Sequence, residues 1–370
     1  MRIGILTSSR ADFGIYLPLL KKMREDSYFS MEIIAFGTHL SHFFGHSIDT
    51  VLEEGFDVPH RIDALVLGDT EESVSTSMAL TAMKFSSFWS ANRNRFDLIF
   101  CLGDRYEMFS AVTAAIPFGI KIAHFHGGET TLGAIDNIFR HSISLASKLH
   151  FVSTEDYEKR LFLLTGSQKN IYNVGALSLD SIGSIPLYSI EEFNDKWNID
   201  LSKPSILLTL HPETLAVSKN YDYAVIMARV INSLKDFQFV ITMPNADTEG
   251  SVIRKVWDKE FTNHSRVFMI ENFGTKGYFT CLKYCAVVVG NSSSGIIEAA
   301  SFNRYVVNVG ERQAGRAKSE NTYDTPFDED GIVQLIIKLS KSKEYRGKNL
   351  YWNGGASERI IQALKNPTND

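Results

Sequence analysis

Three carboxylates in the first half of the chain could carry out acid–base chemistry. Asp104 directly follows the apolar run Leu98–Gly103, and Glu129 follows a Gly-Gly turn. Asp136 lies four residues before Arg140, so on a helix the two side chains would share a face and could pair. Carboxylates in different environments let one site supply both a general acid and a general base. Taken alone, Asp136 and Arg140 could equally form a plain surface pair.

A second candidate site lies in the stretch VVVGNSSSGIIEAA, residues 287–300. A buried valine strand leads through Gly290 and a small polar turn into a helix expected from about Gly295. Backbone N–H groups and the hydroxyls of Ser292 and Ser293 at a helix N-terminus could hold a phosphate. Ordinary helix capping by these serines is the alternative. The chain has neither a Walker A motif nor G-x-G-x-x-G, which excludes a P-loop ATPase and an ordinary dinucleotide site.

Further polar residues of the second half also follow apolar runs. Glu298 could accept hydrogen bonds from ribose hydroxyls, or it could simply complement the helix dipole. Arg312 and Arg316 could complete an anion site, or they could belong to a solvated basic loop. His211 ends an apolar run and is followed by a proline, and we interpret it as a substrate contact.

The elements that must position these residues alternate between strands and helices, which predicts βαβ units with parallel sheets. Helical patterns are expected over Ile15–Arg24, Tyr106–Pro117 and Thr154–Leu164. Strands are expected over Arg2–Thr7, Met31–Gly37, Leu98–Gly103, Lys121–His126, Leu149–Ser153, Ile171–Gly175, Ser205–Leu210, Phe237–Met243, Arg266–Ile270, Ala286–Gly290 and Tyr305–Val309.

The strand pattern pauses between about 177 and 204, which predicts two doubly wound, Rossmann-like domains. We expect an N-terminal domain over 1–178, a C-terminal domain over 179–354, and a final helix or tail over 355–370. Ligands of such sheets bind beyond the carboxyl ends of the strands. Because polar loops of both halves fall there, we expect a single active-site cleft between the domains. These loops are 8–14, 38–39, 104–107, 127–129, 211–214, 245–247 and 291–295.

Composition excludes several other classes of protein. A 44% hydrophobic and 22% charged chain is typical of a globular protein. The net charge of -5 and the lack of a long basic run disfavour nucleic-acid binding. No window approaches the roughly 18 apolar residues of a membrane span, and the N-terminus is a poor signal peptide. The three cysteines indicate a reducing cytoplasm rather than a disulfide framework.

The sequence does not favour a metal centre. His39, His42 and His46 have metal-like spacing, but their surroundings suit a loop that runs into a helix. We expect His124 and His126 to be buried, hydrogen-bonded histidines rather than metal ligands.

Together, these motifs resemble the UDP-N-acetylglucosamine 2-epimerases, and most closely the hydrolysing branch used in bacterial sialic acid synthesis. The non-hydrolysing branch usually has a lysine soon after the first-loop arginine and an arginine-rich segment after the histidine of the second domain. This chain instead has Ile15 and Pro212–Glu213 at those places. The motifs that carry the resemblance are GDRYE (103–107), HGGE (126–129), IDNIFRHSI (135–143), LHPETL (210–215), NADT (245–248), GNSSSG (290–295) and GERQAGR (310–316).

The resemblance implies a glycosyltransferase-B-like pair of Rossmann domains and no need for NAD or a metal. It implies anti elimination of UDP from UDP-N-acetylglucosamine, followed by water addition to 2-acetamidoglucal, giving N-acetylmannosamine for sialic acid and surface polysaccharide synthesis. One alternative is the UDP-N,N'-diacetylbacillosamine 2-epimerase of legionaminic acid synthesis. Another is a sugar transferase of the same fold. We expect a cytoplasmic homodimer or homotetramer that binds a UDP-sugar substrate and UDP product, and no nucleic acid or membrane.

The resemblance also assigns residue roles. Asp104, Glu129 and Asp136 are the acid–base carboxylates, and His211 and Arg140 orient or stabilise the departing diphosphate. Arg105 could be structural and hold Asp104. The residues assigned to UDP or substrate binding are Arg10, Asn245, Ser292, Ser293, Gly295, Glu298 and Arg312.

Overall fold

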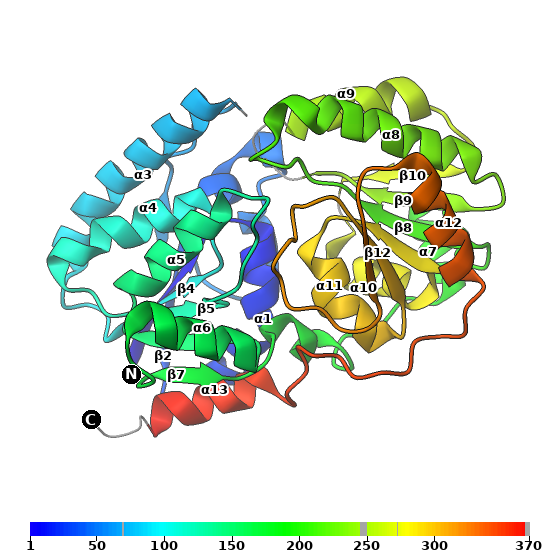
Figure 1. The fold of residues 1–370 in the computed structure, drawn as a ribbon. Helices are drawn as coiled ribbons and strands as arrows, with labels where there is room; N and C mark the ends of the chain where they lie inside the picture. The colour runs from blue at the N-terminus through cyan, green and yellow to red at the C-terminus, as the bar shows by residue number, and fades with distance from the viewer. Residues whose placement is uncertain (69, 245–249, 272, 367–370) are drawn as a thin grey trace. The chain divides into compact units, whose positions relative to one another are not determined.

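The computed structural model describes residues 1–68, 70–244, 250–271 and 273–366, and the chain forms two compact α/β units (Figure 1). Unit 1 comprises 1–129, 136–181 and the described residues from Asn353 onward. Unit 2 comprises 130–135 and 182–352. The expected boundary after 178 thus lies three residues before the end of the main part of unit 1. The expected tail belongs to unit 1, and the short segment 130–135 leaves unit 1 to join unit 2.

Unit 1 is built on a seven-stranded parallel sheet in the order β3-β2-β1-β4-β5-β6-β7. The order reverses between β1 and β4, and ligands of doubly wound sheets bind beside such a reversal. The edge strand β3 was not expected, because three residues are too few to make an apolar run. The strands are β1 (Arg2–Thr7), β2 (Ser30–Phe36), β3 (His60–Ile62), β4 (Leu98–Leu102), β5 (Ile122–Phe125), β6 (Leu149–Val152) and β7 (Ile171–Asn173).

The helices of unit 1 differ from the expectation at two places. Helix α1 begins at Arg10 rather than Ile15, because Ser9 and Asp12 form a capping box. The 22-residue helix α3 was not expected, because its buried face mixes serine and threonine with aromatic residues. The helices are α1 (Arg10–Arg24), α2 (Ile48–Glu53), α3 (Glu71–Asn92), α4 (Tyr106–Ala115), α5 (Asp136–Ala146), α6 (Glu155–Thr165) and α13 (Ala356–Lys365).

Unit 2 contains a six-stranded parallel sheet in the order β10-β9-β8-β11-β12-β13. Its central strands β8, β11 and β12 are neighbours, so the loops that follow them meet at one edge of the sheet. The strands are β8 (Ser205–Thr209), β9 (Gln238–Thr242), β10 (Val267–Ile270), β11 (Val287–Gly290), β12 (Tyr305–Val309) and β13 (Thr322–Thr325). The helices are α7 (Ile190–Trp197), α8 (Asn220–Ser233), α9 (Gly250–Phe261), α10 (Gly274–Tyr284), α11 (Ser293–Glu298) and α12 (Glu329–Ser340). Strand β13 was not expected, because its sequence TYDT lacks an apolar run.

Both sheets are buried on both faces, as parallel sheets normally are. The last helix α13 completes unit 1: Ile360 and Leu364 join the same apolar cluster as Leu19 of α1. The Asp180 carboxylate accepts hydrogen bonds from the first backbone N–H groups of this helix, at Ala356 and Ser357. The predicted α/β fold with parallel sheets is confirmed. None of the described helices is both long and apolar enough to span a bilayer.

Candidate active site

A buried arginine connects the loops of two predicted acid–base residues at the carboxyl edge of the unit 1 sheet. Arg140 on α5 is 2% exposed. Its Nη2 donates to the carboxylate of Asp104, which follows β4, and its Nη1 donates to the backbone oxygen of Glu129 at 3.1 Å. Arg140 therefore fixes the loops after β4 and β5 together. Asp136 is half-buried at the first position of the same helix, one turn before Arg140.

The Glu129 side chain is held by two polar neighbours. Its Oε1 lies 2.9 Å from His126 Nδ1 and accepts a hydrogen bond from Ser153 Oγ at 3.0 Å, and the residue is only 3% exposed. The turn before it needs Gly128, because φ there is +76° and a Cβ atom would lie 2.6 Å from the Tyr157 oxygen. The tight turn thus delivers a buried carboxylate directly after β5.

His124 on β5 helps to position Asp104, because it contacts the residue before it and helix α5. Its Nε2 lies 2.8 Å from the Gly103 carbonyl oxygen, so Nε2 carries the proton, and Nδ1 accepts from Ser144 Oγ at 3.0 Å. Burial lowers the pKa of His124 to about 3, so the imidazole stays neutral. The neutral ring links the residue before Asp104 to helix α5. The expectation of a buried, hydrogen-bonded histidine is confirmed for His124.

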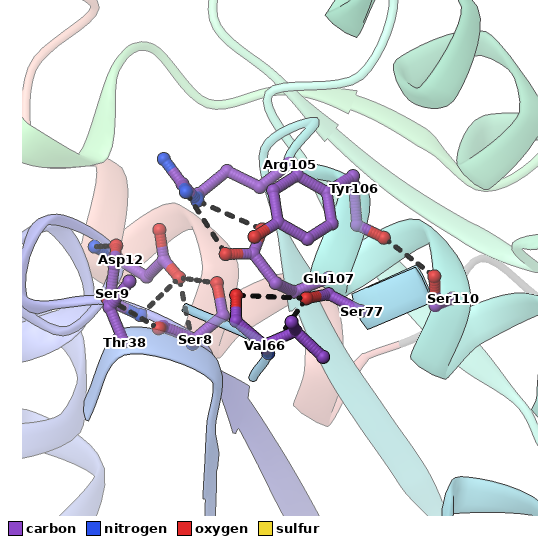
Figure 2. A network of polar contacts seen from close by, with 10 residues as sticks. All are labelled: Ser8, Ser9, Asp12, Thr38, Val66, Ser77, Arg105, Tyr106, Glu107 and Ser110. Carbon is purple, nitrogen blue, oxygen red and sulfur yellow. Dashed lines mark hydrogen bonds and ion pairs between the residues drawn. The ribbon is translucent and has the colours of Figure 1, made fainter. Parts of the chain in front are cut away.

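The remaining unit 1 candidates lie around the ends of β1 and β4, and Figure 2 shows the polar contacts there. The Asp12 carboxylate accepts from Ser8 N and Oγ at 2.9 and 2.7 Å. Arg105 pairs with Glu107, its Nη2 donating to Oε1 at 3.0 Å, and Glu107 is 1% exposed. Arg10 was expected in the loop after β1. It lies instead in the first turn of α1, where it is half-buried.

In unit 2, Asn291 connects the loop after β11 with the loop after β8. Its side-chain Oδ1 accepts from His211 N at 2.7 Å, and its Nδ2 donates to the His211 oxygen at 2.8 Å. Asn291 is fully buried, and this pair of contacts fixes the backbone of the candidate residue His211. Gly290 precedes it with φ +125°, and a Cβ atom there would lie 1.9 Å from the Thr209 oxygen.

The serine-rich turn after β11 leads into helix α11 earlier than expected, at Ser293 rather than Gly295. Ser292 caps this helix, and its hydroxyl accepts from Ser294 N. Ser294 Oγ donates to Glu298 Oε2, 2.6 Å away. Gly295 is buried, where a Cβ atom would contact Val288 and Val306 of the sheet, so its small size lets the helix approach the strands.

The loop after β12 brings Arg312 to the same edge of the unit 2 sheet. Arg312 Nη1 and Gln313 Nε2 donate to the Asn291 oxygen at 3.1 and 2.9 Å. The main chain of this loop is held by Glu213, whose Oε1 accepts from the backbone N–H groups of Glu311 and Arg312 at 2.7 and 3.1 Å. Arg316, the other arginine of the loop, is 6% exposed and therefore not part of a solvated loop.

Segment 130–135 joins Glu129 to Asp136 and packs within unit 2. Leu132 N donates to the Ala314 oxygen at 2.9 Å, and Ile135 N donates to Thr214 Oγ1 at 3.0 Å. Gly133 lies so close to the loop after β12 that a Cβ atom would be 2.3 Å from the Glu311 oxygen. Two predicted acid–base residues thus flank a segment that the β8 and β12 loops hold.

The structure brings together Asp104, Glu129 and Arg140 in unit 1, and His211, Ser292 and Arg312 in unit 2. Asn245 lies outside the described residues. Sequence reasoning missed the positioning contacts of four side chains: Glu107, His124, Glu213 and Asn291. His124 lies inside β5 and Asn291 directly follows β11, whereas Glu107 lies in the first turn of α4 and Glu213 four residues after β8, so their only signal in the sequence was a polar residue close to a strand. The carboxylates of the unit 1 group can transfer protons, and the arginine, histidine and serine of the unit 2 group can bind an anion.

Comparisons with known proteins point to one family. Residues 21–365 match the sequence profile of a family described as UDP-N-acetylglucosamine 2-epimerase. The chain is 33% identical over 366 residues to the hydrolysing UDP-N,N'-diacetylbacillosamine 2-epimerase of Legionella pneumophila, covering 98% of this chain and 95% of that protein. It is 34% identical over 346 residues to the hydrolysing GDP/UDP-N,N'-diacetylbacillosamine 2-epimerase of Campylobacter jejuni, covering 93% and 88%.

The fold resembles solved structures of the same family. The Neisseria meningitidis UDP-GlcNAc 2-epimerase, solved with UDP-GlcNAc bound, superimposes with a TM-score of 0.81 at 15% identity. The match covers 99% of this chain and 100% of that one.

Proposed function

This chain belongs to the UDP-N-acetylglucosamine 2-epimerase family, and we propose that it is a hydrolysing member. It converts a UDP-linked 2-acetamido sugar and water into UDP and the free sugar with inverted configuration at C2. The carboxylates of unit 1 act on the sugar, and the loops of unit 2 bind the nucleotide.

The reaction proceeds in two steps. A carboxylate removes the proton from C2, the bond between C1 and the diphosphate oxygen breaks, and its electron pair leaves with UDP. Water then adds to the resulting double bond: its oxygen bonds to C1, and a proton reaches C2 on the face opposite to the one first deprotonated. Protons, the diphosphate leaving group and the water oxygen move, and no hydride or electron passes to another molecule, so the chemistry needs no redox cofactor.

The contact of Arg140 with both acidic loops is the observation that carries this proposal. Removal of the C2 proton from one face and its return on the opposite face require more than one acid–base group, and Arg140 holds the loops of Asp104 and Glu129 at one sheet edge. Asp136 is the third candidate, one helical turn from Arg140. The charge of Arg140 also favours the developing negative charge of a departing diphosphate.

In unit 2, we assign the diphosphate to the turn of Ser292 and Ser293 together with Arg312 and His211, and the ribose to Glu298. The contacts of Asn291 with the loops after β8 and β12 support this assignment, because they fix His211 and Arg312 at one sheet edge. Replacing Ser293 by alanine should weaken UDP binding measured by calorimetry. Unchanged affinity would contradict the assignment.

Two sugars are candidates for the substrate. The relatives from Legionella and Campylobacter favour UDP-N,N'-diacetylbacillosamine, since both are hydrolysing epimerases of that sugar and exceed 30% identity. The family description favours UDP-N-acetylglucosamine, whose product would be N-acetylmannosamine for sialic acid synthesis.

Proton NMR in D2O decides between these possibilities. The purified chain is incubated separately with each UDP-sugar, and both UDP release and the C2 proton are followed. Free 2-epimeric sugar with deuterium at C2 supports the hydrolysing route, and the faster of the two sugars identifies the substrate. An equilibrium mixture of two UDP-sugars would instead show a non-hydrolysing epimerase, and no reaction of either sugar would contradict the proposal.

A further inference from the structure

Glu213 is a buried carboxylate that the proposed reaction does not use. It is 3% exposed and, among the described residues of unit 2, the only aspartate or glutamate buried to this degree. Burying a carboxylate is costly unless hydrogen bonds replace its water. Burial raises the pKa of Glu213, and the neighbouring Glu311 adds to the effect. Because burial of the Glu213 carboxylate is unfavourable, we expect it to have a role that an apolar side chain could not have.

The partners of Glu213 are two successive backbone N–H groups rather than a cation. Its Oε1 accepts from Glu311 N at 2.7 Å and from Arg312 N at 3.1 Å. Consecutive N–H groups that point to one place form an anion-binding nest. Gly310 permits the close approach: its φ is +79°, and a Cβ atom would lie 2.4 Å from Glu213 Oε1. The nest after β12 is therefore occupied by the chain's own carboxylate.

The Glu213 backbone is fixed in turn, because its N–H donates to Asn220 Oδ1 of α8 at 2.9 Å. The loop that Glu213 holds then contacts the third strand end. Arg312 Nη1 and Gln313 Nε2 donate to the Asn291 oxygen, and the Asn291 amide pairs with the His211 main chain. The contacts of Glu213 and Asn291 thus link the loops after β8, β11 and β12.

We propose that Glu213 is a positioning residue for nucleotide binding: its carboxylate holds the backbone of 311–312 so that Arg312 is presented to the diphosphate. The inference rests on the proposed function, in which unit 2 binds UDP. Glu213 does not touch the nucleotide. It acts through the loop, so its contribution requires the Arg312 guanidinium.

The test is a double-mutant cycle read out as the dissociation constant for UDP by calorimetry. The variants are Glu213→Ala, Arg312→Ala and the two combined. We expect each single substitution to weaken binding about tenfold, the size of one lost charge-assisted hydrogen bond. In the Arg312→Ala background, Glu213→Ala should weaken binding less than about twofold, because the guanidinium that it positions is gone.

Two further variants separate positioning from plain stability. Glu213→Gln keeps an oxygen that can accept both N–H groups, so UDP affinity should stay within about threefold of the wild type. Glu260→Ala removes an exposed carboxylate of α9 in the same unit and should leave the affinity unchanged. Should Glu213→Ala not fold, Glu213→Asp replaces it in the cycle, because it keeps the charge but shortens the reach by one methylene.

Wild-type affinity for UDP in the folded Glu213→Ala or Glu213→Asp variant would overturn the inference. The inference would also be overturned if the double variant weakened UDP binding by the product of the two single effects. That result would show that Glu213 acts independently of Arg312. A wild-type chain that binds no UDP would contradict the proposed function and this inference with it. Binding by the wild type with no effect at Glu213 contradicts the inference alone.

Discussion

At the scale of single residues, the candidate residues are held by buried polar side chains that bind mainly to backbone groups of the loops. Arg140 joins the two acidic loops of unit 1, and neutral His124 anchors the carbonyl before Asp104. In unit 2, the Asn291 side chain binds the backbone of His211, and the Glu213 carboxylate binds the backbone of Arg312. Preorganised groups of this kind need little rearrangement when charge develops in a transition state.

The first prediction concerns Asp104. Asp104→Asn keeps the size of the side chain but removes an acid–base group, so turnover should fall by about 10²- to 10⁴-fold. The UDP affinity should change less than about threefold, because the nucleotide is assigned to unit 2. Steady-state rates of UDP release and calorimetry measure the two quantities.

The control for this variant is Asp97→Asn, which removes an exposed carboxylate of unit 1 that pairs with Arg2. Its turnover should match the wild type. Wild-type turnover of Asp104→Asn would contradict the acid–base role.

At the scale of elements, segment 130–135 is the unexpected feature. It is held by Thr214 and by the loop after β12, and the residues that flank it are Glu129 and Asp136. The segment therefore links the two predicted acid–base residues along the chain while its own backbone contacts lie within unit 2. A shift of about 1 Å in a catalytic group can cost about 100-fold in rate.

The second prediction follows from Gly133. In Gly133→Ala the new methyl group would lie 2.3 Å from the Glu311 oxygen, so either the segment or the loop must move. We expect a fall in turnover of about tenfold or more with the melting temperature of the protein within a few degrees of the wild type. Activity assays and calorimetric melting measure these effects.

Ile138→Ala is the matched control, since Ile138 is 63% exposed on the neighbouring helix α5. It should retain activity. Full activity of Gly133→Ala would show that the position of segment 130–135 does not matter for turnover.

At the scale of the whole molecule, buried neutral histidines make stability depend on pH. Burial lowers the pKa of His124 to about 3 and that of His150 to about 4. In the unfolded chain both groups return to about 6.5. Below that pH the unfolded state binds protons that the folded state does not, so stability falls as the pH falls from about 6.5 to about 4.

The third prediction is that His150→Phe flattens this dependence. His150 Nδ1 has no hydrogen-bond partner among the described residues, so an apolar ring of similar shape loses no such contact there. Removal of one histidine should reduce the slope of unfolding free energy against pH by up to roughly 1.4 kcal/mol per pH unit. Urea unfolding at several pH values between about 4 and 7.5 measures the slope.

Ile138→Ala, at an exposed side chain of unit 1 that carries no titratable group, is the control. The slope of this control should equal that of the wild type. An unchanged slope for His150→Phe would mean that His150 is not kept neutral by burial.

Most of the strands, their alternation with helices and the polar residues that follow the strands could be predicted from the sequence. These features depend on local patterns: apolar runs, glycine turns and polar residues directly beyond them. Asp104, Glu129 and His211 could be identified in this way. The weak elements β3, β13 and α3 could not, because β3 is very short, β13 lacks an apolar run and α3 has a mixed polar and apolar face.

Which of these residues contact one another follows from the packing of the folded chain. Asp104 and Arg140 are 36 positions apart, and Glu213 and Arg312 are 99 apart. No local pattern encodes such a pair, because the contact exists only when packing brings two strand ends or a helix together. The path of segment 130–135 into unit 2 has the same origin: it is set by backbone contacts to Ala314 and to the Thr214 hydroxyl.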